Sequence, residues 1–240
     1  MLTRCVVAAA ALAVIGLGAR AENLAPAARP VPVVDEEPID LDLSGRPATR
    51  DADLPRARWE HRGKGEFWTR VALSAVQTHG RPLIETLPKD IEDWCPAYAE
   101  NDDEDRAAFW VGLLSTLSRY ESTWNPAAVG GGGLWFGLLQ IYPPTAEFRD
   151  CRVQTGEGLK RASANLNCAV RIMAVTVPRD NAISVKDTRW RGVAADWGPI
   201  RTPWMQRDMK RYTKRQTYCR NLSEVRPPER PGQSGEIATN

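Results

Sequence analysis

Every aromatic side chain of the 240-residue chain lies between Trp59 and Tyr218, a window that holds nine tryptophans, five tyrosines and four phenylalanines. Large aromatic side chains supply much of the apolar surface that a core buries. The segments outside the window therefore lack the material for a core of their own. Residues 59–220 are numerous enough for one domain, so the sequence predicts a single folded domain with a segment on either side.

The two segments before that domain differ in character. Residues 1–21 start with a basic Arg4, continue with an apolar run and end Ala19-Arg20-Ala21, which is the plan of a cleavable signal peptide too short to span a bilayer. We predict cleavage after Ala21, no membrane span thereafter, and a periplasmic or extracellular location.

Residues 22–58 hold six prolines, eight acidic residues and no aromatic residue, which predicts a disordered leader suited to docking an envelope partner. Residues 221–240 read as a flexible tail.

Four cysteines remain once the signal peptide is removed. An even number in a chain bound for an oxidising compartment predicts two disulfides. Four cysteines allow three pairings. We favour Cys151 with Cys168, because that pair would pin a local loop to the helix that follows, and this leaves Cys95 with Cys219.

Composition argues against several classes of function. The 32 basic and 30 acidic residues leave no large basic field of the nucleic-acid-binding kind. Two histidines without Cys-x-x-Cys or His-x-x-x-His spacing argue against a zinc site, and nucleotide and serine-hydrolase motifs are missing from the sequence. We therefore expect no cofactor, no metal and no nucleic-acid partner, and we expect a monomer.

The domain reads as mainly α, with little or no sheet. Turn-forming residues separate segments of helical periodicity, and no alternating apolar and polar run demands a strand. Helices are predicted over 66–78, 105–120, 144–149, 163–176, 184–196 and 203–218. The acidic cluster at 102–105 is a natural helix start, since carboxylates complement the positive end of the helix dipole.

One carboxylate has an unusual predicted environment. Phe109, Leu113 and Leu117 follow one another at steps of four, and Glu121 continues that apolar stripe at the end of the second predicted helix. A carboxyl group withdrawn from water has a raised pKa. Glu121 is thus predicted to face inward and to be able to donate a proton near neutral pH.

The residues after Glu121 strengthen this prediction. They read Glu-Ser-Thr-Trp-Asn-Pro over 121–126, a glycine run over 130–133, Gly-Leu-Leu-Gln-Ile over 137–141 and Pro-Thr-Ala over 144–146. In order, spacing and identity these 26 residues resemble the soluble lytic transglycosylase family, and residues 165–173 match a third block of that family loosely. The resemblance implies a lysozyme-like, two-lobed domain with the glutamate in a central cleft.

The resemblance also implies an activity. The enzyme would cleave the β-1,4 bond between N-acetylmuramic acid and N-acetylglucosamine in peptidoglycan strands without water, giving 1,6-anhydro products, with Glu121 as the single general acid and base. Ser122 would orient Glu121, and Gln140 would hydrogen-bond the glycan. The full set of expected substrate-binding residues is Ser122, Trp135, Gln140, Tyr142, Asn165, Asp196 and Trp197.

The sequence departs from the family in three respects. Trp135 makes the loop before Gly137 bulkier, and it would be either a sugar-stacking platform or a plug between the lobes. The family's tyrosine near the glutamate is replaced by the stretch around Asp196 and Trp197, and Tyr120 or Tyr142 could take its place. Asp196 adds a second carboxylate, so a hydrolytic lysozyme stays open as an alternative, as does a catalytically silent glycan-binding module.

Overall fold

The computed structural model describes residues 54–220. The predicted signal peptide, the predicted leader up to residue 53 and the predicted tail lie outside these residues. The described part is mainly α, as predicted. Its helices are α1 (Gly65–Gln77), α2 (Arg81–Glu85), α3 (Asp103–Ser122), α4 (Pro143–Phe148), α5 (Gly156–Leu159), α6 (Ala162–Asp180) and α7 (Pro203–Lys214), with short 3-10 turns η1 (Ile91–Asp93), η2 (Gly192–Ala195), η3 (Pro199–Arg201) and η4 (Thr217–Cys219).

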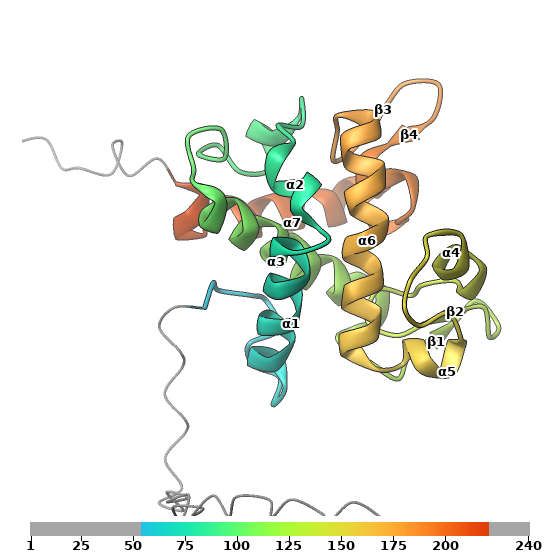
Figure 1. Cartoon of the computed structure of the whole chain (residues 1–240). Coiled ribbons are helices and arrows are strands. Elements are labelled where there is room, and N and C mark those ends of the chain that lie inside the picture. The colour runs from blue at the N-terminus through green and yellow to red at the C-terminus, as the bar shows by residue number, and fades with distance from the viewer. Residues whose placement is uncertain (1–53, 221–240) are drawn as a thin grey trace, which may run out of the picture. The chain divides into compact units, whose positions relative to one another are not determined.

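Strand structure in this part is confined to two small antiparallel ribbons. β1 (Val129–Gly130) pairs with β2 (Trp135–Phe136), and β3 (Val185–Lys186) pairs with β4 (Trp190–Arg191). β1, β2, α4 and α5 lie together on one side of α6, while α1, α2 and α3 lie on the other (Figure 1). α6 therefore separates a helical body from a smaller lobe built from residues 129–159.

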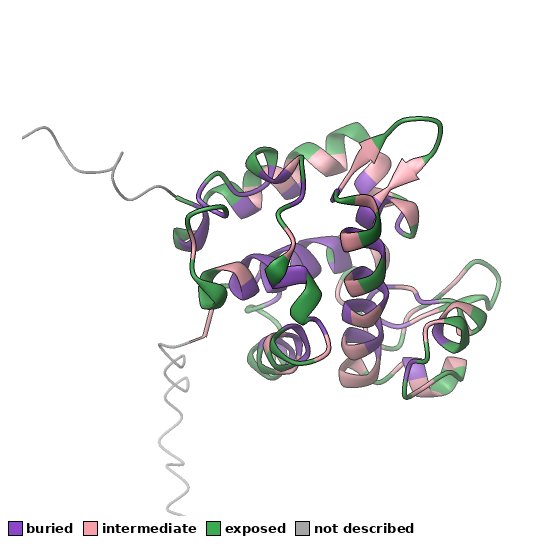
Figure 2. Cartoon of the chain, turned by 45° about the horizontal axis from the view of Figure 1, so that its top comes forward, coloured by how far each residue is buried: buried purple, intermediate pink, exposed green. Residues whose placement is uncertain are grey.

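Helix α3 is the centre of the core. Every residue from 107 to 118 is buried, and Figure 2 shows that burial along the helix. A helix buried on all sides is mostly apolar, and the three buried hydroxyls of this stretch, on Ser115, Thr116 and Ser118, are hydrogen-bonded. The helix begins at Asp103, within the acidic cluster predicted to start it and two residues before the predicted bound, because the Asp102 side chain accepts a hydrogen bond from the Asp105 backbone N–H at 2.9 Å and so caps the first turn.

Five of the six predicted helices are present with shifted ends, but the helix predicted over 184–196 is wrong. That stretch forms the β3–β4 hairpin and η2. The Asp187 carboxylate accepts the backbone N–H of Arg189 at 3.0 Å, which closes a tight turn in place of a helical one. Gly192 follows at φ +65°, where an added Cβ would lie 1.9 Å from the Ala182 carbonyl oxygen. The short helices α2 and α5 were not predicted.

The predicted start of the domain is also corrected. Residues 54–58, assigned to the disordered leader, pack against the domain: Ala57 is buried, and the Arg58 guanidinium hydrogen-bonds Thr116 and Asp208. The Tyr218 hydroxyl donates to the carbonyl of Arg56 at 3.2 Å. Backbone and arginine contacts of this kind leave no trace in the aromatic content on which the boundary was based.

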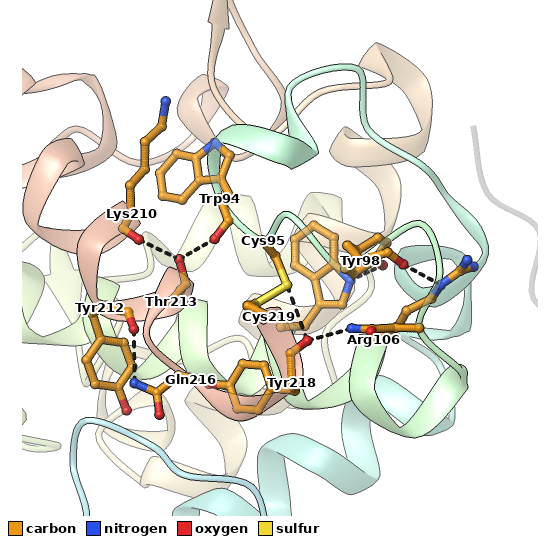
Figure 3. Close-up of a disulfide and its surroundings, with 12 residues drawn as sticks. Trp94, Cys95, Tyr98, Arg106, Lys210, Tyr212, Thr213, Gln216, Tyr218 and Cys219 are labelled. Carbon is orange, nitrogen blue, oxygen red and sulfur yellow. Dashed lines mark hydrogen bonds between the residues drawn. A yellow bond between two sulfur atoms is a disulfide. The ribbon is translucent and has the colours of Figure 1, made fainter. Parts of the chain in front are cut away.

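Both predicted disulfides are confirmed. Cys95 bonds to Cys219 and Cys151 bonds to Cys168, with Cα atoms 4.6 and 5.2 Å apart. Figure 3 shows that the first bond joins the chain near its C-terminal end to the segment after η1. Within residues 54–220, no helix has the length and apolarity needed to cross a membrane.

Candidate functional site

The end of α3 is held in place from three directions. The Tyr120 hydroxyl donates a hydrogen bond to the Asp208 carboxylate on α7. The Ser122 hydroxyl donates to the Leu138 carbonyl at 2.9 Å. The Trp124 indole N–H folds back to the Ser115 carbonyl at 2.8 Å. The last turn of the helix is thus a rigid support for the residue at its centre, Glu121.

The chain leaves α3 through two residues in the left-handed region, Thr123 at φ 52° and Trp124 at φ 56°. The N–H of Thr123 bonds back to the carbonyl of Arg119 at 3.0 Å, a common way to satisfy the last carbonyls of a helix. A β-branched residue in this conformation is strained. Strain of this kind gathers at functional sites, where surrounding structure maintains it.

Glu121 is partly buried, and no group within residues 54–220 forms a hydrogen bond or ion pair with its carboxyl. Burial raises the pKa of Glu121 from 4.5 to about 7, because a low-dielectric surrounding disfavours the charged form. The inward orientation and the raised pKa predicted from the apolar stripe are therefore confirmed. A carboxyl group in this state can give a proton near neutral pH and take one back.

The segment after β2 is clamped by buried side chains. The Asn165 side chain accepts the Leu139 N–H at 2.8 Å and donates to the carbonyls of Phe136 and Leu159 at 2.8 and 3.0 Å. The Trp197 indole N–H donates to the Leu139 carbonyl at 2.9 Å.

This clamp corrects three of the expected substrate-binding residues. Asn165 is fully buried and only 4 % of Trp197 is exposed, and their polar atoms are used on backbone. Ser122 donates to Leu138 rather than to Glu121. The three side chains therefore position the 136–141 segment against α3. A resemblance between sequences could not reveal this, because it names residues without showing which atoms form the contacts.

Gln140 follows in the same segment at φ 46°. Its side-chain amide N–H group donates to the carbonyls of Gly137 and Ala128, at 2.9 and 3.3 Å. No donor within residues 54–220 reaches its side-chain oxygen, which would lie 2.3 Å from a Cβ added at Gly130. Gln140 is thus a brace for the β1–β2 hairpin that keeps one acceptor available.

The β1–β2 hairpin and α4 expose aromatic surface. Trp135 is 44 % exposed and Tyr142 is 40 % exposed. An added Cβ at Gly131 would lie 2.0 Å from the six-membered ring of Trp135, so the indole packs against this glycine. Trp135 is too exposed to be a plug between lobes, and an exposed indole is a side chain of the kind that stacks on sugars.

The two tyrosines considered as replacements for the missing family tyrosine differ. Tyr120 is committed to Asp208. Tyr142 has no hydrogen-bond partner for its hydroxyl in the part of the chain that the structure describes. Of the two, only Tyr142 has its hydroxyl available for a ligand.

Asp196 lies among basic side chains. Its side chain is exposed, yet the protein around it displaces enough water to raise its pKa, an effect that the charges of Arg149, Arg179 and Arg201 oppose. Glu121 is not among the groups that act on Asp196, and burial alone acts on Glu121.

Some supporting residues had no signal in the sequence. Asp208 accepts hydrogen bonds from Arg58, Tyr120 and Arg211, and these lower its pKa well below the usual range even though burial alone would raise it. Arg149 carries the one buried side-chain nitrogen without a hydrogen-bond partner among the described residues. Arg58 and Tyr120 lie 150 and 88 residues from Asp208 in the chain, so local patterns do not reveal these two contacts. Nowhere in residues 54–220 do three His, Cys, Asp or Glu side chains gather as metal ligands.

Comparison with known proteins gives a structural likeness. No family model and no curated protein matches the chain. Among solved structures, the fold is similar to Bd0314 DslA in its wild-type form 2, with a TM-score of 0.63 and 25% identity over 69% of this chain and 98% of that one. Two DslA structures with single glutamate-to-glutamine substitutions, at positions 154 and 143 of that protein, match with TM-scores of 0.64 and identities of 25% and 24%.

Proposed function

We propose that the chain is an exported peptidoglycan lytic transglycosylase of the lysozyme-like superfamily in which Glu121 is the only catalytic carboxylate. The observation that carries the proposal is the state of Glu121: partly buried, unpaired among the described residues, and with a pKa of about 7. It stands at the start of the motif that resembles the soluble lytic transglycosylases. The two disulfides support an oxidising location outside the cytoplasm.

The reaction needs one group that acts twice. Protonated Glu121 gives its proton to the glycosidic oxygen between N-acetylmuramic acid and N-acetylglucosamine, and the bond from that oxygen to C1 breaks. The resulting carboxylate then takes the proton of the muramic C6 hydroxyl as that oxygen bonds to C1. The product is a 1,6-anhydro sugar, Glu121 regains its proton and no water is consumed. A pKa near working pH suits a group with both roles.

A single carboxylate fits the surroundings of Glu121. The glutamates substituted in DslA are eleven residues apart in that protein, whereas Glu121 is the only acidic residue of this chain between positions 106 and 146. Asp196, the partner that a hydrolytic mechanism would need, exerts no influence on the Glu121 pKa. An intramolecular nucleophile replaces the second carboxylate, provided the sugar is held in position. Trp135, Tyr142 and the side-chain oxygen of Gln140 are available for that task.

Product analysis tests the proposal. Purified peptidoglycan is digested with the wild-type protein, with Glu121→Gln and with Glu147→Gln, a matched change at an exposed glutamate on α4, and the fragments are identified by mass spectrometry. We expect 1,6-anhydromuropeptides from the wild type and Glu147→Gln, and a loss of at least about a hundredfold for Glu121→Gln.

The other outcomes separate the alternatives. Fragments that end only in reducing muramic acid would identify a hydrolase, and their loss in Asp196→Asn would name Asp196 as its second carboxylate. Absence of any fragment, with retention of the protein on insoluble peptidoglycan, would identify a silent glycan-binding module.

A further inference from the structure

A cavity of about 710 Å³ lies away from Glu121, between the end of α1, the first half of α6 and the loop after α4. The residues that line it are Thr78, His79, Cys151, Arg152, Val153, Arg161, Ser163, Ala164, Asn167, Cys168 and Arg171. Three arginines and a histidine are among them, and none of them is acidic. The cavity is therefore basic, in a chain whose total charge is nearly balanced.

The arginines of this cavity lack counter-charges. The side chains of Arg152, Arg161 and Arg171 make no hydrogen bond or ion pair with any residue in 54–220. Several arginines elsewhere in the fold are paired, as Arg81 is with Asp103 at 2.6 Å and Arg191 with Asp187 at 2.9 Å. Guanidinium groups gathered without acceptors present planar forks of donors that suit phosphate oxygens.

The frame of the cavity is rigid. The disulfide between Cys151 and Cys168 fixes the loop that carries Arg152 to α6. A His79 ring nitrogen, Nε2, lies 3.0 Å from the Asn167 carbonyl. A carbonyl can only accept, so Nε2 carries a hydrogen and joins α1 to α6. The loop that carries Arg152 and the helix that carries Arg171 are thus held in fixed relation before any ligand arrives, which reduces the ordering cost of binding.

The spacing of the charges indicates the size of the ligand. Arg161 and Arg171 are ten residues apart, one just before α6 and one within it, so their Cα atoms are about 15 Å apart along the helix. Guanidinium groups that start this far apart on the chain can contact one anion at two or more points, and this favours an anion with more than one charged group. The N-terminal end of α6 lies at the same cavity and adds a partial positive charge.

We propose that this cavity is a binding site for an anion that carries two or more phosphate groups. The inference is independent of the catalytic proposal, because the cavity does not include Glu121 and the ligand need not be cleaved. Phosphates of this kind could come from a soluble oligophosphate or from phosphomonoester head groups on a lipid surface. Both present the same chemistry to the arginines.

Calorimetric titration with inorganic tripolyphosphate tests the site, with orthophosphate and citrate as comparison anions. The variant is Arg161→Ala with Arg171→Ala. The matched control is Arg207→Ala with Arg215→Ala, which removes the same charge from exposed positions outside the cavity. We expect saturable tripolyphosphate binding at least about tenfold tighter than that of orthophosphate or citrate. The double variant should weaken it at least about tenfold, and the control should leave it unchanged at an unaltered melting temperature.

Vesicles that contain phosphatidic acid separate the sources. Flotation of the wild type with these vesicles, and not with neutral ones, would assign the site to a lipid surface, whereas tripolyphosphate binding without flotation would assign it to a soluble ligand. The proposal is overturned if tripolyphosphate does not saturate the protein, if the control pair weakens binding as much as the cavity pair, or if orthophosphate or citrate binds as tightly as tripolyphosphate.

Discussion

At the residue scale, the buried carboxyl group of Glu121 lowers the stability of the folded chain at neutral pH. The pKa of Glu121 is about 7 in the folded chain against 4.5 for an ordinary glutamate, so the folded state holds its proton more tightly than the unfolded state does. Folding is unaffected below pH 4.5. Between pH 4.5 and 7 the unfolded chain gains stability by ionising while the folded chain does not, so the free energy of unfolding falls as pH rises.

The raised pKa of Glu121 predicts the behaviour of Glu121→Gln. Glutamine keeps the shape and cannot ionise, so the variant should be more stable than the wild type by about 1–3 kcal/mol at pH 8. At pH 4 the two should agree. Urea unfolding at both pH values measures the difference. Glu147→Gln, at an exposed position, should not raise the free energy of unfolding in this pH-dependent way. If both variants become more stable at pH 8, the stabilisation does not come from the buried position of Glu121.

At the element scale, one asparagine determines the shape of the segment after β2. Asn165→Ala leaves the Leu139 N–H and the carbonyls of Phe136 and Leu159 without their partners, and buried polar groups without partners are costly. The free energy of unfolding should fall by about 3 kcal/mol, and turnover of peptidoglycan should fall with it. The control is Asn167→Ala, which loses one local bond to Ser163. If Asn165→Ala and Asn167→Ala lower the free energy of unfolding equally in chemical denaturation, Asn165 does not hold the segment after β2 as proposed.

The glycine run offers a second matched pair on the β1–β2 hairpin. Gly131 and Gly132 both have positive φ, at 57° and 67°, but an added Cβ meets the Trp135 ring at Gly131 and open space at Gly132. Both alanine variants carry a backbone penalty of about 1 kcal/mol. Gly131→Ala should also displace Trp135 and so lower both stability and retention on peptidoglycan further. Indistinguishable unfolding curves and pull-down yields would show that the indole does not rest on the glycine.

The sequence predicts an element well when the residues that determine it lie within that element, and poorly when distant residues determine it. The α3 stripe, its acidic cap and Glu121 at its end all follow from residues within one helix, and the structure matches them. The β3–β4 hairpin does not, because the hydrogen bonds that the Asp187 carboxylate accepts override a helical periodicity. At the site, the roles of Asn165 and Trp197 depend on which backbone atoms they meet, and those atoms lie 26 and 58 residues away.

At the scale of the whole molecule, the two disulfides differ in what they enclose. Cys95 and Cys219 are 124 residues apart, and Cys151 and Cys168 are 17 apart. A cross-link reduces the entropy of the unfolded chain more as the enclosed loop lengthens, by about 5 kcal/mol for the longer loop and about 3 kcal/mol for the shorter one. All four cysteines are buried, so the packing lost on substitution is comparable.

The longer disulfide also secures contacts that close the fold. Beside it, the Tyr218 carbonyl accepts a hydrogen bond from Asn101, and its hydroxyl donates to the carbonyl of Arg56. The last residues of the described chain thereby hold its first ones. The double variant Cys95→Ala with Cys219→Ala should therefore lose more stability than Cys151→Ala with Cys168→Ala, by about 2 kcal/mol or more in urea unfolding. A larger loss from the 151–168 pair would mean that attachment of the smaller lobe to α6, rather than closure of the chain ends, limits the stability of the domain.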